Sequence, residues 1–314
     1  MSHRSRRSRM VLLGIVLGLC CGCQVDDDGD DDWTQGRDAR PGTPAEWAVI
    51  AEAQARRLET LSIFSGNGSL VIDSKDDQGK TTTDRLNHRL WRVAPDKAAL
   101  RLSVSGIPLG RLGWNGTRWW LLNEGPDRPE LTVVDMKDPQ GPLSMEEETL
   151  SPPVVLFMIG LMPFPSEAPS DFMIAGDRAR FSLDSIRWSR AGGDLVAGNR
   201  HAIVVGAPAD GPIGIEVFDD AGMPSGLVAL SRFEPVETLG KPPGAWPNLP
   251  NRIVLSSTHD VLYRVVITFD GPLAQGRISE RLFDLDALVE RVDPVLVEGR
   301  DMTSQRLLES KDAP

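Results

Sequence analysis

Cysteine and histidine are the side chains that most often carry nucleophilic or metal chemistry, and this 314-residue chain has three cysteines and four histidines. The cysteines fall within four positions, at Cys20, Cys21 and Cys23, directly after a short apolar run. No histidine has a second histidine within five residues, so the spacing of a helical metal site such as H-E-x-x-H is absent. The pattern favours modification of a cysteine near the start of the chain, and we expect no metal site and no cofactor.

The first 22 residues have the composition of a bacterial export signal. Four arginines precede the apolar run Met10–Leu19, which is too short to cross a bilayer. The sequence from Leu19 to Cys23 resembles a lipobox, in which a small residue precedes the acylated cysteine, and Gly22 is that small residue. We therefore predict a lipoprotein signal peptide, cleaved before Cys23, with lipid such as palmitate on the Cys23 thiol. An ordinary cleaved signal is the alternative, and Ser5-Arg6-Arg7 leaves twin-arginine export open beside the general route.

An acidic stretch follows the predicted anchor. Residues 26–32 read DDDGDDD, and polar residues continue to Gly42. Because like charges repel, we predict an extended, disordered tether over residues 23–42. A calcium site or a sorting signal is the alternative, although the stretch lacks the distal glutamate of an EF-hand loop. The formal net charge of −11 argues against nucleic acid as a partner, because phosphate backbones are bound by clustered lysine and arginine.

Signatures of catalysis are missing from the rest of the chain. It has no G-x-S-x-G, no G-x-x-x-x-G-K-[ST] and no H-E-x-x-H. Asp284 and Asp286 could be paired carboxylates, but such neighbours are usually solvated. A lipidated Cys23 would leave no thiol in the mature chain for a disulfide, zinc or catalysis. We therefore expect that the protein is not an enzyme, and catalysis on a lipid is the third-ranked reading.

Strands and one helix must position whatever the chain binds. Thr43-Pro44-Ala45-Glu46 is a capping box with proline at the first helical position, which predicts a helix to about Leu58. Lys97–Val104 alternates between apolar and polar residues, as a strand with one wet face does. Asn115-Gly116 is a strong hairpin signal, and Thr117–Asn123 returns as the next strand. Other strands are expected at Ile63–Asp73, Lys80–Val93, Leu112–Trp114, Glu130–Asp135, Arg180–Ile186, His201–Val205, Ile213–Phe218, Leu227–Phe233, Asn251–Ser256 and Val261–Phe269.

Val154–Met162 is apolar on every side and is bounded by prolines. It is too short to span a bilayer, and a helix that is apolar all round is normally buried. It is either a lid that closes a groove or plain core. Leu282–Leu288 is expected as a short strand end or a helical turn.

Two neighbouring segments carry a family resemblance. After a helix and long strands come WRVAPDKAALRL, from Trp91 to Leu102, and WNGTRWWLL, from Trp114 to Leu122. Their order resembles the lipoprotein-localisation carriers LolA and LolB and their outer-membrane lipoprotein relatives. PNRIVL, at Pro250–Leu255, and ISERLFDL, at Ile278–Leu285, are similar to the closing strands of that family. The resemblance covers roughly residues 46–290.

The resemblance implies a mainly β protein with helices (α+β), whose strongly bent antiparallel sheet of about 11 strands forms an incomplete β-barrel with a helical lid. Residues 43–300 would be this domain, and residues 301–314 a polar tail. The loop with Leu109 would correspond to the exposed leucine loop of LolB and contact the membrane. In LolA an arginine holds the lid, and the sequence does not place its counterpart. The ligand-binding residues implied are Leu100, Leu102, Trp114, Trp119, Trp120, Phe157, Met158, Leu161 and Met162.

The expected function is that of a lipoprotein of the bacterial cell envelope, anchored on the periplasmic side of the outer membrane. It would bind acyl chains or another apolar ligand in the half-barrel and could take part in lipoprotein or lipid transfer. The partners expected are the membrane, through the lipid anchor, and an apolar ligand or lipoprotein acyl chains, with the protein itself a monomer. The alternative is a non-catalytic scaffold lipoprotein of the same fold whose cavity is filled by side chains.

Overall fold

The structure is a computed structural model that describes residues 38–75, 80–124, 128–135, 156–188, 195–206, 211–218, 224–257 and 263–296. The predicted signal peptide, the anchor Cys23, the acidic run 26–32 and the tail 301–314 lie outside these residues, as do Val154 and Val155 of the predicted lid. Within the described ranges, no helix is both long and apolar enough to cross a membrane.

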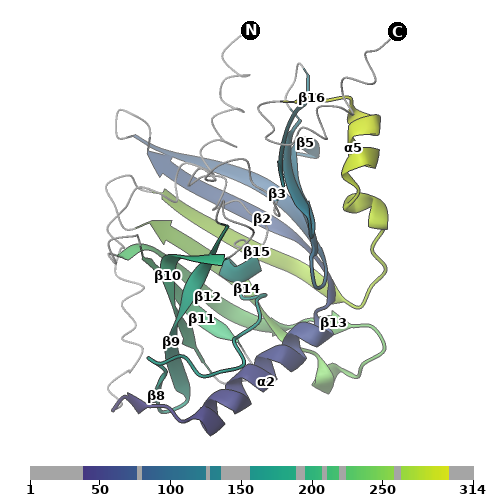
Figure 1. The fold of residues 1–314 in the computed structure, drawn as a ribbon. Helices are drawn as coiled ribbons and strands as arrows, with labels where there is room; N and C mark the ends of the chain where they lie inside the picture. The colour runs from purple at the N-terminus through teal and green to yellow at the C-terminus, as the bar shows by residue number, and fades with distance from the viewer. Residues whose placement is uncertain are drawn as a thin grey trace.

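The described residues form one open sheet of sixteen strands. Along the sheet the order is β1-β8-β9-β10-β11-β12-β14-β15-β2-β3-β4-β5-β6-β7-β16, so most neighbours in sequence are also neighbours in space, and β13 pairs with β15 beside this path. The pairs are antiparallel except β13 with β15 and β16 with β7. The sheet curves strongly around one side (Figure 1), which gives the incomplete barrel that was predicted.

The strands of the first half are β1 (Arg40–Pro41), β2 (Ile63–Lys75), β3 (Thr81–Val93), β4 (Lys97–Val104), β5 (Ile107–Asn115), β6 (Arg118–Asn123) and β7 (Glu130–Asp135). Those of the second half are β8 (Met173–Ala175), β9 (Arg178–Trp188), β10 (Leu195–Val205), β11 (Pro212–Phe218), β12 (Pro224–Pro235), β13 (Glu237–Thr238), β14 (Asn248–Ser257), β15 (Tyr263–Ala274) and β16 (Val295–Leu296). The helices whose bounds lie within the described residues are α2 (Pro44–Thr60) and α5 (Leu285–Val292), with 3-10 turns at Pro243–Ala245 and Glu280–Leu282. Residues 156–158 of the predicted Val154–Met162 helix are also helical, and the helix ends there and not at Met162.

The start of α2 follows the predicted capping box. The Thr43 hydroxyl accepts a hydrogen bond from the Glu46 amide at 3.3 Å, and the Glu46 carboxylate accepts one from the Thr43 amide at 2.9 Å. Arg40 and Pro41 pair with β8, so this part of the predicted 23–42 tether is a strand and not disordered. Figure 1 shows α2 crossing one end of the curved sheet.

The stretch from β4 to β6 folds as its sequence predicts. Lys97–Val104 is a strand, and Asn115 and Gly116 stand at the turn between β5 and β6. Gly116 has φ of 87°, a conformation that favours glycine. The Asn115 side-chain oxygen accepts hydrogen bonds from the amides of Thr117 and Arg118 at 3.2 and 2.9 Å, which stabilises the turn.

The adjacent residues Trp119 and Trp120 point to opposite faces of β6, and both are buried, at 1% and 2% exposed. Trp119 packs with Val134, Trp114 and Leu121, whereas Trp120 packs against α5. The prediction that both faces of this strand are covered is therefore confirmed. The expected cover of the outer face was wrong, because α5 takes the place that was assigned to the Thr43–Leu58 helix or a neighbouring loop.

One sequence interpretation changes around α5. The stretch ISERLFDL is not a closing strand, because it holds a 3-10 turn, Glu280–Leu282, and the start of α5. Asp284 is the N-cap of α5, and its carboxylate accepts a hydrogen bond from the Ala287 amide at 3.0 Å. Leu285, Leu288 and Val289 then place one apolar face on the sheet. Gly113 is the partner of Trp120 on the neighbouring strand β5. A Cβ at Gly113 would lie 2.3 Å from the Trp120 ring, so the glycine makes room for this ring under α5.

Candidate functional site

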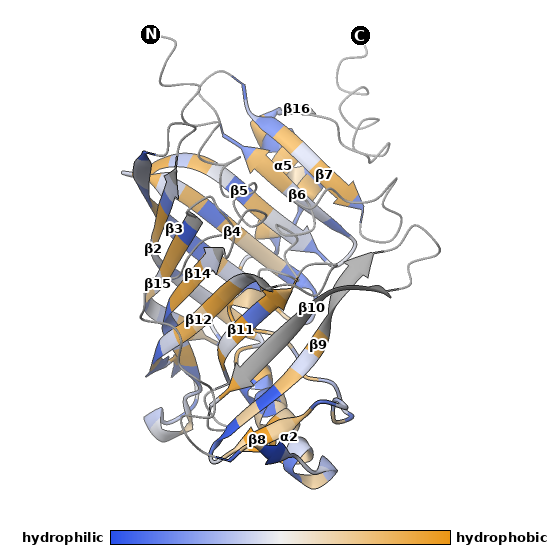
Figure 2. Ribbon diagram, turned by 90° about the vertical axis from the view of Figure 1, so that its left-hand side faces the viewer, coloured by the Kyte–Doolittle hydropathy of each residue, from blue (hydrophilic) through white to orange (hydrophobic). Residues whose placement is uncertain are grey.

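The concave face of the sheet is lined by rows of apolar side chains that come from different strands at the same register. The clearest is a leucine row across β3 to β6, made of Leu90, Leu100, Leu112 and Leu121. Leu90 and Leu112 are buried, and Leu100 and Leu121 are half-buried. Figure 2 shows apolar and polar positions alternating along several of the strands. Because successive side chains of a strand point to opposite faces, this alternation places the apolar set on one face. Such a face suits acyl chains or an apolar protein segment.

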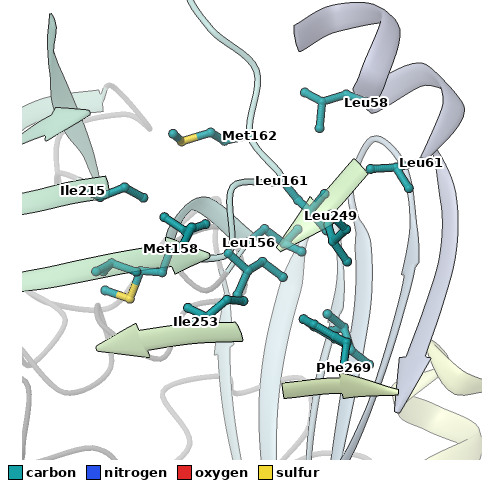
Figure 3. Packing of buried hydrophobic residues seen from close by; sticks show 14 of the residues in the cluster. Leu58, Leu61, Leu156, Met158, Leu161, Met162, Ile215, Leu249, Ile253 and Phe269 are labelled. Atoms are coloured by element: carbon teal, nitrogen blue, oxygen red, sulfur yellow. The ribbon is translucent and has the colours of Figure 1, made fainter. Parts of the chain in front are cut away.

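A segment of the chain, residues 156–172, crosses this concave face and is called the crossing segment below. Leu156, Met158, Ile159, Leu161 and Met162 are between 2% and 7% exposed. They join one hydrophobic cluster with side chains of α2 and of the strands in both halves of the sheet. Figure 3 shows Leu156, Met158, Leu161 and Met162 among apolar side chains that include Leu249 and Ile253 of β14.

Polar side chains of α2 hold the backbone of the crossing segment. Gln54 donates to the carbonyl oxygens of Met162 at 2.8 Å and Gly160 at 3.2 Å. Arg57 donates through Nη1 to the Gly160 carbonyl and through Nε to the Asn248 carbonyl, both at 2.9 Å. Gln54 and Arg57 are only 1% and 4% exposed. Arg57 therefore ties α2, the crossing segment and β14 together.

Aromatic packing holds the other end of the crossing segment. Trp47 of α2 lies with its ring centroid 5.9 Å from Phe164, 5.2 Å from Phe172 and 4.6 Å from Phe181. The Trp47 indole also donates to the Pro165 carbonyl at 3.0 Å. Because Phe181 belongs to β9, this cluster connects α2 and the crossing segment to the far half of the sheet.

The structure brings together all but one of the predicted ligand residues. Trp120 is the exception, since it packs on α5 at the opposite face. The residues that join the main concave cluster or pack against it are Leu100, Leu102, Leu109, Trp114, Phe157, Met158, Leu161 and Met162. Trp119 adjoins this cluster through Trp114. Leu109, the predicted membrane contact, is half-buried, and the most exposed apolar side chain near the β4–β5 turn is Ile107, at 67% exposed.

Sequence reasoning missed Gln54 and Arg57 as residues that hold the crossing segment. The available signal was Gln54 itself, a polar residue that interrupts the apolar stripe of the helix. A polar side chain on a buried helix face needs hydrogen-bond partners, so it marks a contact with exposed backbone. The partners could not be named from the sequence, because the Arg57 contacts reach 103 and 191 residues along the chain.

Replacing Arg57 with methionine is expected to loosen the crossing segment. The change keeps an apolar stem but leaves the Gly160 and Asn248 carbonyls without this donor, at a cost of about 1–3 kcal/mol. Amides around Gly160 should exchange faster with deuterium, and the urea midpoint should fall. Arg56→Met is the matched control, because Arg56 lies on the exposed side of α2 and pairs only with Glu52 at 3.3 Å. Equal exchange rates in the two variants would contradict the role of Arg57.

A second hollow lies on the outer side of the molecule, between the β5–β6 hairpin and the turn before α5. Its volume is about 360 Å³. The lining is mostly charged, and Lys97 and Glu280 form an ion pair across it at 2.6 Å. Charged walls that already pair with each other do not suit an apolar ligand, so the concave face is the better candidate site.

Comparison with known proteins shows which solved structures share this fold. No protein-family model and no curated protein matches the chain. Among solved structures, a domain from Vibrio parahaemolyticus assigned to outer membrane lipoprotein sorting superposes with a TM-score of 0.50. It shares 13% sequence identity, over 78% of this chain and 99% of that domain. The chain has the lipoprotein-sorting fold.

Two further structures are similar at lower scores. A DUF1329 family protein from Desulfovibrio piger has a TM-score of 0.48 at 11% identity, covering 79% of this chain and all of that one. A LolA superfamily protein from Nitrosomonas europaea has a TM-score of 0.45 at 11% identity, covering 76% and 98%. The predicted fold, a strongly bent antiparallel sheet that forms an incomplete barrel, is confirmed by the strand order and by the Vibrio domain. Identity this low carries no residue role from one protein to another, so the site is argued from this chain alone.

Proposed function

We propose that this protein is a lipid-anchored lipoprotein of the bacterial cell envelope that holds an acyl chain or a similar apolar ligand on the concave face of its sheet, beneath the crossing segment. The observation that carries the proposal is how the cover is held. Within the described residues, no backbone hydrogen bond ties residues 156–165 to a strand. The segment is held instead by side chains of α2 and by apolar contacts.

This arrangement allows the cover to move without disrupting the sheet. Apolar contacts are not directional, so an acyl chain can replace the side chains of Phe157 or Met158 in the concave cluster with little loss of buried area. A strand in the same place would have to break its ladder of backbone hydrogen bonds. The lipoprotein-sorting fold agrees with such a role, and we propose that the ligand is passed on unchanged, as in lipoprotein or lipid transfer, by a monomer that performs no catalysis.

Native mass spectrometry tests the binding function. When the protein is released from membranes without detergent exchange, it should carry bound acyl lipids, seen as additional mass. After delipidation, it should take up acyl lipids again from vesicles. A preparation that carries no lipid and takes up none would overturn the proposal.

The alternative is a scaffold lipoprotein in which side chains fill the concave side. The observation in its favour is the burial of the crossing segment, whose Leu161 is 2% exposed and Ile159 3% exposed. A scaffold with a filled interior and a carrier without its ligand would have the same buried crossing segment, and only ligand uptake distinguishes them. The same mass spectrometry separates the two, because a scaffold would show no lipid under either condition.

Cys23→Ser is expected to release the protein from membranes or to block its processing. The thiol of Cys23 is the proposed acylation site, after Gly22 and the apolar run, and a serine hydroxyl cannot take its place. Palmitate labelling should be lost, and the protein should move to the soluble fraction or accumulate as precursor. Cys21→Ser is the matched control and should keep both label and membrane fraction. Unchanged labelling of Cys23→Ser would contradict the anchor assignment.

A further inference from the structure

One row of the concave face differs from the apolar rows beside it. It runs across six strands at one register, from β2 to β7, and is made of Phe64, Arg92, Ala98, Trp114, Trp119 and Val134. Three of these residues carry N–H groups, and none carries a hydrogen-bond acceptor in its side chain. The next row along the strands on the same face is the leucine row, about 7 Å away at the spacing of a β-strand.

Three N–H donors of this row, one from each of these residues, are buried and have no acceptor among the described residues. Arg92 Nε, Trp114 Nε1 and Trp119 Nε1 are fully covered, yet none has a partner. The only printed bond of the Arg92 guanidinium runs from Nη1 to the Leu61 carbonyl at 2.8 Å. Buried donors are almost always paired in folded proteins, so three unpaired donors in one row point to an acceptor that the described residues do not supply.

The positive charge of Arg92 also indicates a missing partner. Arg92 is 6% exposed, and no ion pair joins it to a carboxylate within the described part of the chain. Burial alone lowers its pKa, and no acidic neighbour acts to raise it. Arginine nevertheless stays protonated in proteins, and a buried cation is costly unless an anion accompanies it. The missing partner is therefore an anion.

We propose that Arg92, Trp114 and Trp119 bind the anionic oxygen headgroup, a carboxylate or a phosphate, of an amphiphilic acyl ligand whose chain lies along the leucine row; this rests on the binding function proposed above. An ionised carboxylate or phosphate accepts hydrogen bonds and donates none when fully ionised, which matches a row of donors. Ala98 stands between Arg92 and Trp114 and has the smallest side chain of the row. It would therefore leave the most room for a headgroup between the guanidinium and the indole.

The test compares acids with neutral analogues of the same chain length. Binding of oleate and of methyl oleate, and of oleoyl lysophosphatidate and of monoolein, is measured on the delipidated protein by isothermal titration calorimetry, which does not depend on the tryptophans of the row. We expect each acid to bind at least about tenfold more tightly than its neutral partner, a difference of about 1.4 kcal/mol. The pair with the larger ratio identifies carboxylate or phosphate as the headgroup.

Arg92→Gln should remove most of the preference for acids and leave the affinity for the neutral analogue within about twofold. Trp114→Phe and Trp119→Phe should each reduce the preference for acids several-fold. Arg89→Gln is the matched control, because Arg89 lies on the same strand but is exposed on the other face, over the Trp91 ring at 5.0 Å. If Arg92→Gln does not fold, the two tryptophan variants decide the question.

The outcomes separate this inference from the binding function. Equal affinities for acid and neutral analogue in the unaltered protein would overturn the headgroup site and leave the binding function standing. A preference for acids that survives all three substitutions would place the headgroup elsewhere and overturn the inference too. No binding of any of the four ligands would overturn the binding function itself.

Discussion

Phe157→Asp is expected to abolish binding of a fluorescent fatty acid while the protein still melts cooperatively. Phe157 is half-buried in the crossing segment, whereas Met158 and Ile159 beside it are 7% and 3% exposed. A carboxylate at position 157 can therefore stay partly hydrated, at a modest cost in the free energy of unfolding. It would still place a charge where the acyl chain is proposed to lie, and an unpaired charge in an apolar site costs several kcal/mol.

The matched control is Ile159→Asp in the same segment. Its side chain is buried, so the new charge would have neither water nor a partner, and we expect the domain to lose several kcal/mol of stability. Fatty-acid uptake and thermal unfolding are measured on both variants. If Phe157→Asp also loses its cooperative melt, the crossing segment is plain core and not a lid.

Trp119→Phe is expected to remove most of the fluorescence change that a bound acyl chain produces. Trp119 is on the concave face and 1% exposed, next to Trp114 and Leu121, so a ligand there changes the surroundings of its indole. Trp120→Phe is the control from the opposite face, where α5 covers the ring, and it should leave the ligand response intact.

Acrylamide quenching gives an independent readout of the same pair. Both indoles should be protected in the delipidated protein because both are buried, and ligand should alter the protection of Trp119 only. Equal quenching of the two with and without lipid would contradict a ligand site on this face.

The local elements were predictable because short-range physics specifies them. The capping box at Thr43 and Glu46 satisfies the first amides of a helix whatever the rest of the chain does. Asn115 and Gly116 specify a tight turn between strands, and Lys97–Val104 has the period of a strand with two unlike faces. These signals need only a few consecutive residues, so they can be recognised in the sequence.

The helix α5 was harder to predict because it is only eight residues long. Its apolar positions, Leu285, Leu288 and Val289, make a single turn and a half of periodic pattern, which a strand end or a helical turn can match equally well. Packing against Trp120, Leu122 and Leu131 decides that it is a helix and covers the outer face. That contact joins parts of the chain more than 150 residues apart, and local sequence carries no record of it.

By itself, the sequence predicts an export signal with a candidate anchor at Cys23, and it determined an antiparallel sheet of many strands whose fold the Vibrio domain shares. Alternation shows that Trp119 and Trp120 must face opposite ways, but it is symmetric and cannot say which face is concave. Only the tertiary structure decided that, through the curvature of the sheet and the positions of α2 and α5. It also placed Arg57 on the crossing segment and Arg92 in a row with two tryptophans, since strand register brings together residues that lie far apart in sequence.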